Sequence, residues 1–427
     1  MAGTQTNRHN PKLAMVLSIL LAGLGQLYNR RYVKGIVFIL VEFSFLATLG
    51  RFINEGIWGI RTLGTIPGEH HSIFLIIFGL ISFILLGFAL ALYVFNIIDA
   101  KKDAERLARG EANRGIWEAF RHAWDKGFPY VFVTPGLVML LFIVVLPLMF
   151  TVALAFTDYN LYNSPPRKLL NWVGFDNFAN LATMKVWKDT FFNVFTWTIV
   201  WTVIATTLQI ALGLFLALLV NDPRIKFKRL IRTVLILPWA VPAFVTILIF
   251  AAMFNDKFGT INRDILSMFQ IAIPWLQDPF WTKTALIMIQ TWLGFPFVFA
   301  LFTGVLQSIS KDWYEAADVD GGTRMQKFRY ITFPHIMYAT APLLIMQYAG
   351  NFNNFNIIYL FNGGGPAVRG QNAGGTDILI SWVYKLTFEL NQYNMAAAIS
   401  LILGLIVSGF AFFQFRRTRA FKEEGNL

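Results

Sequence analysis

The sequence contains no cysteine and has little charge. Without cysteine there is no disulfide framework, no thiolate metal site and no cysteine nucleophile. Only 14% of the 427 residues are charged, against about 25% in a typical soluble domain. A soluble core of this size would lack the polar residues needed to cover it, so a large soluble protein is excluded. The same composition excludes disordered, collagen-like and coiled-coil chains.

Long apolar stretches dominate instead, since 56% of the residues are hydrophobic and 16% are aromatic. A transmembrane helix needs about 20 mostly apolar residues. Residues 13–28 are shorter and contain Gly23, Gly25 and Gln26, which favours an interfacial or re-entrant helix. The predicted fold class is an all-α polytopic membrane protein with about eight transmembrane helices. The expected spans are residues 35–53, 72–98, 129–156, 191–220, 234–254, 284–307, 339–361 and 395–415.

The net charge of +12 is compatible with nucleic-acid binding, but in so apolar a chain it is better explained by membrane topology. With the amino terminus inside, 25 of the 36 basic residues fall in segments on the cytoplasmic side. An excess of Lys and Arg is typical of that side of a membrane protein. We therefore expect both termini in the cytoplasm, a multi-pass protein of the cell membrane and no nucleic-acid partner.

Two regions of the chain differ in character. Residues 1–128 predict an N-terminal membrane region with two or three apolar helices, and residues 129–427 predict a six-helix core. Between the two regions, residues 99–126 mix acidic and basic side chains and predict a cytoplasmic amphipathic helix. This helix either lies on the inner leaflet or binds a partner. Its apolar face would contain Leu107, Ile116, Trp117, Phe120 and Trp124.

Groups that carry chemistry are scarce. The sequence has no Gly-Lys-Ser/Thr phosphate loop and no HExxH motif. The adjacent His70 and His71 are more typical of a solvated surface pair than of a metal site. Proton- and ion-coupled carriers usually keep ionisable groups at mid-membrane, and the last six expected spans contain none. We expect no catalytic residue, metal site or cofactor in this chain, and we infer an uncharged transported solute.

The loop at residues 308–335 predicts two short helices that meet at a sharp angle. Ser310 can cap the first helix, whose early turns are acidic. Gly321 and Gly322 can end this helix in a left-handed turn. Thr323 can cap the second helix, which stops before Pro334. Local chemistry alone favours a solvated hairpin.

The spacing within this loop resembles the EAA loop of ABC importer permeases. Glu315, Ala316 and Ala317 are followed by Gly321, and then by Ile331-Thr332-Phe333-Pro334, in which Phe stands where the family usually has Leu. The resemblance implies a coupling helix that docks on a separate cytoplasmic ATPase. In that role the Glu makes polar pairs, the two Ala allow close approach and the Gly supplies the bend.

Three of the expected spans have features that a plain membrane anchor would not need. The fifth contains Pro238 and Pro242, which remove backbone hydrogen bonds and kink it. The sixth contains the run Gln290-Thr291-Trp292-Leu293-Gly294-Phe295-Pro296-Phe297. The seventh has four asparagines within residues 351–356, and their burial is costly unless the amides are paired. Neutral amides beside Trp and Phe rings suit a sugar, because amides bond hydroxyls and rings cover its apolar face. Interhelical packing explains the same composition equally well.

These spans, together with the outside motif Asn362-Gly363-Gly364-Gly365-Pro366, resemble the larger membrane subunit of maltose/maltodextrin importers. The most family-like part is residues 190–416, and the fold implied is the type I ABC importer transmembrane fold. In that family the matching positions line a mid-membrane sugar site. The positions that match are Trp239, Gln290, Trp292, Leu293, Gly294, Phe297, Gly350, Asn351 and Asn354.

Some positions depart from the family pattern. Ala243 and Gly350 stand where a hydroxyl and an aromatic residue can occur, and Gln290 stands where an Asn can occur. Smaller side chains imply a roomier pocket, which favours longer oligosaccharides. The loop at residues 157–189 is too short for the large extracytoplasmic domain that some relatives carry. Docking of a binding protein would then rest on short loops, including residues 363–375.

The resemblance also implies the partners of the chain. These are a second homologous permease subunit, a cytoplasmic ATPase dimer that holds ATP and Mg, and an extracellular solute-binding protein in a bacterial cell. The implied function is import of maltose or maltodextrin. Four alternatives stay open: a permease for another neutral oligosaccharide such as a galactoside, a permease for a glycerol phosphodiester, an ATP-independent carrier or channel, and a membrane-embedded transferase.

Overall fold

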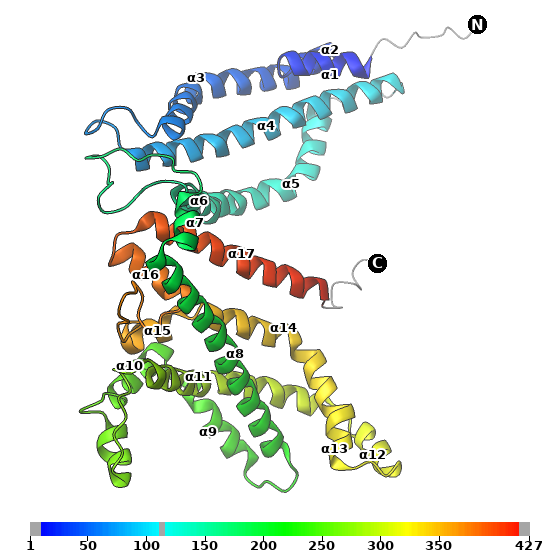
Figure 1. Cartoon of the computed structure of the whole chain (residues 1–427). Helices are drawn as coiled ribbons and strands as arrows, with labels where there is room; N and C mark the ends of the chain where they lie inside the picture. The colour runs from blue at the N-terminus through cyan, green and yellow to red at the C-terminus, as the bar shows by residue number, and fades with distance from the viewer. Residues whose placement is uncertain (1–9, 111–115, 418–427) are drawn as a thin grey trace. The chain divides into compact units, whose positions relative to one another are not determined.

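The computed structural model describes residues 10–110 and 116–417, and every regular element in these ranges is a helix (Figure 1). The chain forms two compact units, Met1–Gly174 and Phe175–Leu427. The third expected span therefore packs with the first unit. The division expected after residue 128 rests on composition and stays a prediction.

The first unit is built on two long antiparallel helices, α3 and α4, which lie side by side (Figure 1). Their connection is fixed by Ser72, which donates to the carbonyl of Leu63 (2.6 Å) and accepts from the main-chain N–H of Leu170 (3.0 Å). A π-helical turn, Leu141–Val145, joins α5 to α6. The helices are α1 (Pro11–Leu20), α2 (Leu24–Tyr28), α3 (Tyr32–Thr62), α4 (Ser72–Ala108), α5 (Ile116–Leu140) and α6 (Leu146–Ala155).

The single amphipathic helix expected over residues 99–126 is wrong. Residues 99–108 continue α4, which ends at Ala108, and Gly110 follows with a left-handed φ of 81°. Residues 116–126 instead begin α5. Glycine adopts this backbone conformation without strain, so the chain can leave the helical path there. Residues 111–115 and the side chains of Ile116, Trp117 and Phe120 lie outside the described part of the chain.

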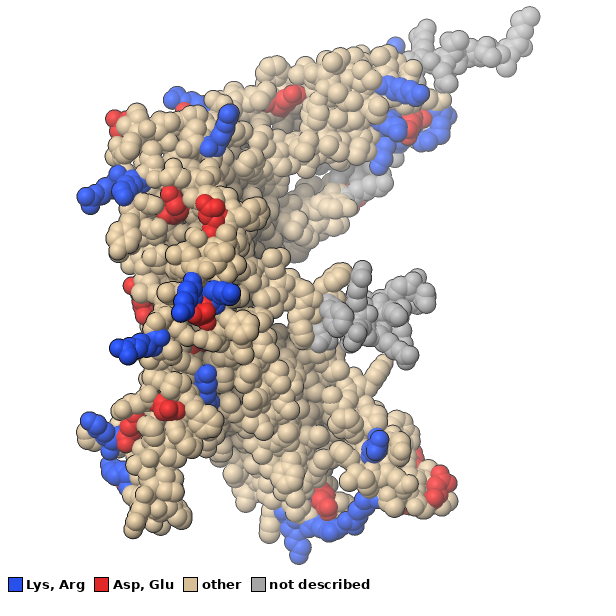
Figure 2. Space-filling view, in the orientation of Figure 1, with Lys and Arg blue, Asp and Glu red and all other residues tan. Residues whose placement is uncertain are grey.

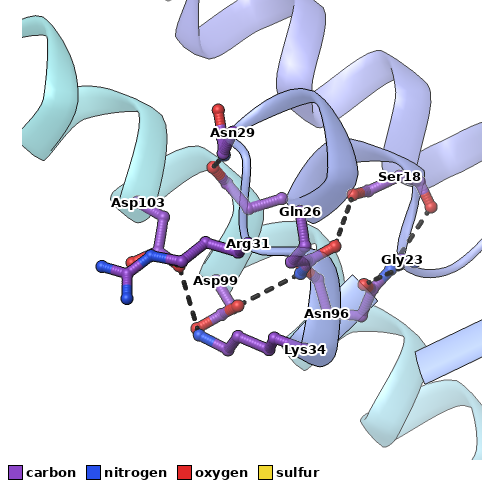
Figure 3. Close-up of polar contacts among 10 residues, drawn as sticks. Ser18, Gly23, Gln26, Asn29, Arg31, Lys34, Asn96, Asp99 and Asp103 are labelled. Atoms are coloured by element: carbon purple, nitrogen blue, oxygen red, sulfur yellow. Dashed lines mark hydrogen bonds and ion pairs between the residues drawn. The ribbon is translucent and has the colours of Figure 1, made fainter. Parts of the chain in front are cut away.

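The segment at residues 13–28 forms a short helical hairpin bound to the end of α4 (Figure 3). Gln26 donates to the carbonyl of Asn96 (2.9 Å) and to the Asp99 carboxylate (3.1 Å). Lys34 forms ion pairs with Asp99 (2.5 Å) and Asp103 (3.3 Å). A helix of ten residues is about 15 Å long, half of what a membrane span needs. The geometry therefore agrees with the interfacial or re-entrant helix expected from the sequence.

The second unit is organised around α8 and α11, which pack along their lengths. Large side chains such as Trp201, Leu286, Ile358 and Phe299 are fully buried in its core. Short π and 3-10 turns are η2 (Ile261–Ile265), η3 (Leu266–Phe269) and η4 (Phe328–Thr332). The α-helices are α7 (Asp176–Thr183), α8 (Lys185–Asn221), α9 (Lys228–Ala240), α10 (Ala243–Met253), α11 (Pro279–Ser308), α12 (Lys311–Val319), α13 (Arg324–Lys327), α14 (Phe333–Phe352), α15 (Phe355–Asn362), α16 (Leu379–Phe388) and α17 (Tyr393–Arg417).

Six helical segments among the described residues are long and apolar enough to cross a membrane. A seventh span results if α9 and α10, which are bent by 87° to one another, are counted together. The expected span at residues 339–361 is helical but is divided at Asn353 into α14 and α15. Charged side chains gather near the helix ends in Figure 2, and α8 has none between Asp189 and its end. The six segments are Tyr32–Thr62, Ser72–Ala108, Gly127–Ala155, Lys185–Asn221, Pro279–Ser308 and Tyr393–Phe412.

Candidate functional site

The loop between α11 and α14 contains the short exposed helix α12. Ser310 caps it, and its side chain accepts from the N–H of Asp312 at 3.3 Å. Glu315 and Ala316 are exposed, and Ala317 is half-buried. The helix ends as the sequence predicts, because the main-chain N–H of Gly322 donates to the carbonyl of Ala317 (2.7 Å). Gly321 has a φ of +75°, a left-handed conformation that favours glycine.

The second half of this loop folds back on α12. Thr323 caps α13 in a reciprocal capping box with Gln326, as its position predicts. An ion pair between Lys327 and Asp318 ties α13 to α12. Pro334 lies in the first turn of α14, where its missing N–H is tolerated. The loop is thus a preformed, capped hairpin.

The hairpin also exposes apolar side chains that the sequence did not single out. Val319 at the end of α12 is 88% exposed, and Met325 and Tyr330 are exposed as well. These residues lie on the same loop as the exposed Glu315 and the two alanines. Apolar side chains grouped with polar ones on an exposed loop are typical of a surface that a partner covers. The geometry therefore supports a docking element better than a plain solvated hairpin.

The two prolines of the fifth span break it as the sequence predicts. The helix α9 ends at Ala240, and α10 begins at Ala243 after the extended residues Val241 and Pro242. Trp239, the residue before the end of α9, packs edge-on against Phe297 of α11 with ring centroids 5.8 Å apart. The indole of Trp239 is 58% exposed in the isolated chain. The break thus places one aromatic ring beside another at an open surface.

The polar residues of the sixth and seventh spans meet in one hydrogen-bonded group. The Asn354 side-chain amide donates to Gln290 Oε1 (3.1 Å) and, more weakly, to Asn351 Oδ1 (3.5 Å). Asn351 in turn donates to Thr206 Oγ1 on α8 (2.8 Å). The structure therefore brings together Gln290, Asn351 and Asn354, three of the residues expected to line a sugar site.

Two glutamines that the sequence analysis missed extend this group. Gln290 donates to Oε1 of Gln209 on α8 (3.3 Å), and Gln209 donates weakly to Oε1 of Gln347 on α14 (3.5 Å). Both are amides within the charge-free spans at residues 191–220 and 339–361, which was the available signal. Together Asn354, Gln290, Gln209 and Gln347 form a continuous series of neutral amides, which we call the amide chain. Its members come from α8, α11 and the end of α14.

The other expected site residues differ in exposure and in what they pack against. Trp292 is 45% exposed and packs edge-on against Phe295, while Leu293 is partly buried in the core cluster. Gly350 borders open space, since an added Cβ would meet no atom within 4 Å. Gly294 is different, because an added Cβ would lie 1.9 Å from Gln209 Oε1. The aromatic rings are thus accessible, whereas the Gly294 face is filled by Gln209.

The glycine motif after α15 is held by a buried carboxylate that the sequence analysis did not predict. Asp377 accepts from the N–H of Gly374 (2.7 Å) and the hydroxyl of Ser381 (2.8 Å), and pairs with Lys385 (2.6 Å). Burial raises the pKa of Asp377 above 3.8, although Lys385 and these hydrogen bonds act in the opposite direction. Gly364 packs directly on this carboxylate. The loop expected to receive a binding protein is therefore held by hydrogen bonds and an ion pair to the buried Asp377.

Known proteins share the sequence and the architecture of this chain. Residues 209–420 match the family described as "Binding-protein-dependent transport system inner membrane component". The chain is 52% identical, over 97% of its length and 99% of the relative, to the galactooligosaccharides transport system permease protein GanP of Bacillus subtilis (strain 168). It is 48% identical, over 96% of both chains, to the maltodextrin transport system permease protein MdxF of the same organism.

A solved structure shares the fold. It is a bacterial alginate ABC transporter in complex with an alginate pentasaccharide-bound periplasmic protein, with a TM-score of 0.58 and 20% identity. The match covers 72% of this chain and 98% of the other. The long apolar helices, the fold and the extended identity agree with one another. The chain therefore belongs to the binding-protein-dependent transport system inner membrane components, the permease subunits of ABC importers, and is a multi-pass protein of the bacterial plasma membrane rather than an enzyme.

Proposed function

We propose that this permease translocates a neutral oligosaccharide of the maltodextrin class. The amide chain is the observation that carries the proposal. Its four amides are uncharged, each both donates and accepts hydrogen bonds, and sugar hydroxyls do the same. Three of its members are Gln290 on α11, Gln347 on α14 and Asn354 just after α14, and the exposed indole rings of Trp239 and Trp292 lie on α9 and α11. A charged substrate would instead need ionised side chains within the membrane spans.

The proposed roles follow from exposure and chemistry. Trp239, Trp292 and Phe297 offer ring faces to the apolar side of a pyranose. The partly accessible Asn354 bonds its hydroxyls, and the buried Gln290 and Asn351 accept from the Asn354 amide and hold it in place, while Leu293, Gly294 and Gly350 shape the path. Open space at Gly350 favours a longer oligosaccharide over a single disaccharide. We call these nine residues the sugar path.

The hairpin at α12 is the proposed link to energy. An ATPase dimer, which holds the ATP and Mg, would contact Glu315, Ala316, Ala317 and Gly321 from the cytoplasm, with Pro334 fixing the start of α14. A second homologous permease would complete the pore, and a binding protein would deliver sugar to the loops around residues 363–375. In this proposal both termini lie in the cytoplasm. Closure of the ATPases would then switch the pore between inward- and outward-facing states.

A galactooligosaccharide is the second candidate substrate. The 52% identity to a galactooligosaccharide permease, across almost the whole chain, favours it. Both sugars are neutral and rich in hydroxyls, so the amide chain suits either. Their glucose and galactose units differ in the orientation of one hydroxyl group, which a site with fixed donors and acceptors can discriminate.

Uptake of labelled maltodextrin in a strain that lacks the endogenous importers tests the proposal. The strain would express this chain with its second permease, ATPase and binding protein. We expect uptake that unlabelled maltodextrin suppresses and galactooligosaccharide suppresses less. Stronger suppression by galactooligosaccharide would support the second candidate. No uptake of either sugar, with an assembled complex in the membrane, would contradict both.

A further inference from the structure

Gln209 lies at the centre of the amide chain but cannot touch a passing sugar. It is fully buried on α8. Its Oε1 accepts from Gln290 (3.3 Å), and its Nε2 donates to Gln347 (3.5 Å). By contrast, Asn354 and Gln347, at the two ends of the chain, are partly accessible. The buried centre therefore connects two accessible ends.

The approach of Gln209 to α11 depends on Gly294. An added Cβ at Gly294 would lie 1.9 Å from Gln209 Oε1 and 2.6 Å from its Cδ, so any larger residue would displace the amide. Gln290 and Gly294 are four residues apart and share one face of α11. The glycine opens the space through which Gln209 reaches Gln290.

The hydrogen bonds of the chain all run in one direction. Asn354 donates to Gln290, Gln290 donates to Gln209, and Gln209 donates to Gln347. Because Gln209 accepts from Gln290 Nε2, the oxygen of Gln290 is turned toward Asn354. The side-chain N–H groups of Asn354 then donate to Gln290 and Asn351 within the protein, and its carbonyl oxygen is left to accept from a ligand. A reversed chain would present a donor at the same place.

We infer that Gln209 is a positioning residue that sets the hydrogen-bonding sense of the sugar path. It acts through Gln290 and Asn354, and the inference rests on the proposed sugar transport. Gln209 thereby determines which hydroxyl pattern the permease accepts. Gly294 serves the same end, because its lack of a side chain admits the Gln209 amide.

The test is sugar uptake by the full importer complex in proteoliposomes, with the Gln209→Met variant. Methionine has a similar volume but neither donates nor accepts a hydrogen bond in this place, so the side-chain N–H of Gln290 loses its acceptor. We expect the KM for labelled maltodextrin to rise about tenfold, as for loss of a buried hydrogen bond, while the maximal rate and the amount of assembled complex stay near wild type. Preference among unlabelled competing sugars should also weaken. Gly294→Ala should raise KM by a similar factor, because it displaces the same amide.

Gln26→Met is the matched control. Gln26 is equally buried and hydrogen-bonded, but it lies in the N-terminal hairpin and ties that hairpin to α4 (Figure 3). We expect this variant to assemble less well without a change in KM.

A wild-type KM and wild-type sugar preference in either the Gln209→Met or the Gly294→Ala complex would overturn the inference. So would a loss of assembly in Gln209→Met with Gly294→Ala unchanged in KM. If the wild-type complex transports no sugar at all, the proposed function fails, and the inference fails with it. If the wild-type complex transports sugar and the variants keep the wild-type KM, the inference is wrong and the proposed function stands.

Discussion

Trp201 on α8 donates its indole N–H to the main-chain carbonyl of Asn351 on α14, over 2.9 Å. The helix α14 ends one residue later, so this carbonyl has no partner in a continuing helix. The main-chain N–H groups of Asn353 and Asn354 also donate to it, that of Asn354 over 3.2 Å. Trp201 is fully buried, so the bond lies in the core of the second unit. This contact lies at the end of α14, directly before the break that precedes Asn354, which donates to Gln290.

Replacing Trp201 with Phe should destabilise the second unit. The change keeps the ring in the core but leaves a buried carbonyl with one partner fewer, which costs about 1–2 kcal/mol. Unfolding of the purified subunit in detergent measures the effect. Trp58→Phe, on an exposed part of α3, is the control and should be close to neutral. Equal stability of the two variants would show that the Trp201 bond contributes nothing.

Gly321→Ala should uncouple ATP hydrolysis from uptake. The φ of +75° makes a side chain at this position strained by about 1–2 kcal/mol, so the end of α12 must rearrange. We expect uptake per ATP hydrolysed to fall about tenfold, the factor that 1.4 kcal/mol represents, with normal expression. Glu315→Ala should act in the same direction by removing the polar contact that we propose it makes to the ATPase.

The control for this prediction is Gly304→Ala on α11. A Cβ at Gly304 meets no atom within 4 Å, and its backbone is helical. This variant should couple normally. An unchanged ratio of uptake to hydrolysis in both Gly321→Ala and Glu315→Ala would remove α12 from the coupling mechanism.

The pH dependence of stability should report the buried Asp377. Because burial raises the pKa of its carboxyl above 3.8, the folded protein favours the neutral form more than the unfolded chain does. The contribution of Asp377 is then fully present below pH 3.8 and is lost as the pH rises through the folded pKa. The stability of wild type relative to Asp377→Asn should therefore decrease from about pH 4 upward.

Thermal unfolding of both proteins between pH 4 and 7 measures this difference. Asp264→Asn is a useful contrast, because the Arg263 guanidinium lowers the pKa of the exposed Asp264, so its contribution is instead lost as the pH falls. A wild-type advantage over Asp377→Asn that grows with pH would mean that the ion pair with Lys385 outweighs burial.

Features that depend on local chemistry could be predicted from the sequence. The apolar runs predicted the long helices, since each is long enough to cross a bilayer and has few charges. Ser310, Gly321 and Thr323 predicted the hairpin at α12, because caps and left-handed turns are decided within a few residues. Pro238 and Pro242 predicted the break between α9 and α10.

Features that depend on distant partners could not be predicted. No proline marks the break at Asn353, where Trp201, 150 residues away in the sequence from Asn351, supplies the hydrogen bond. Gln209 and Gln290 are 81 residues apart, so only the packing of α8 on α11 shows that their amides meet. The helix expected over residues 99–126 failed for the opposite reason, because composition suggested continuity while Gly110 ends the helix locally.

Transport by complexes with altered sugar-path residues tests the central claim most directly. ATP-dependent accumulation of labelled oligosaccharide in proteoliposomes would be compared for wild type, Trp292→Ala, Asn354→Ala and the control Asn356→Ala, whose side chain is exposed on α15. We predict that Trp292→Ala and Asn354→Ala each reduce uptake about tenfold, as expected for one lost stacking or hydrogen-bond contact. Both complexes should assemble as wild type does, and Asn356→Ala should transport at the wild-type rate. Wild-type accumulation by both variants would contradict a sugar path at these residues and leave them a role in helix packing.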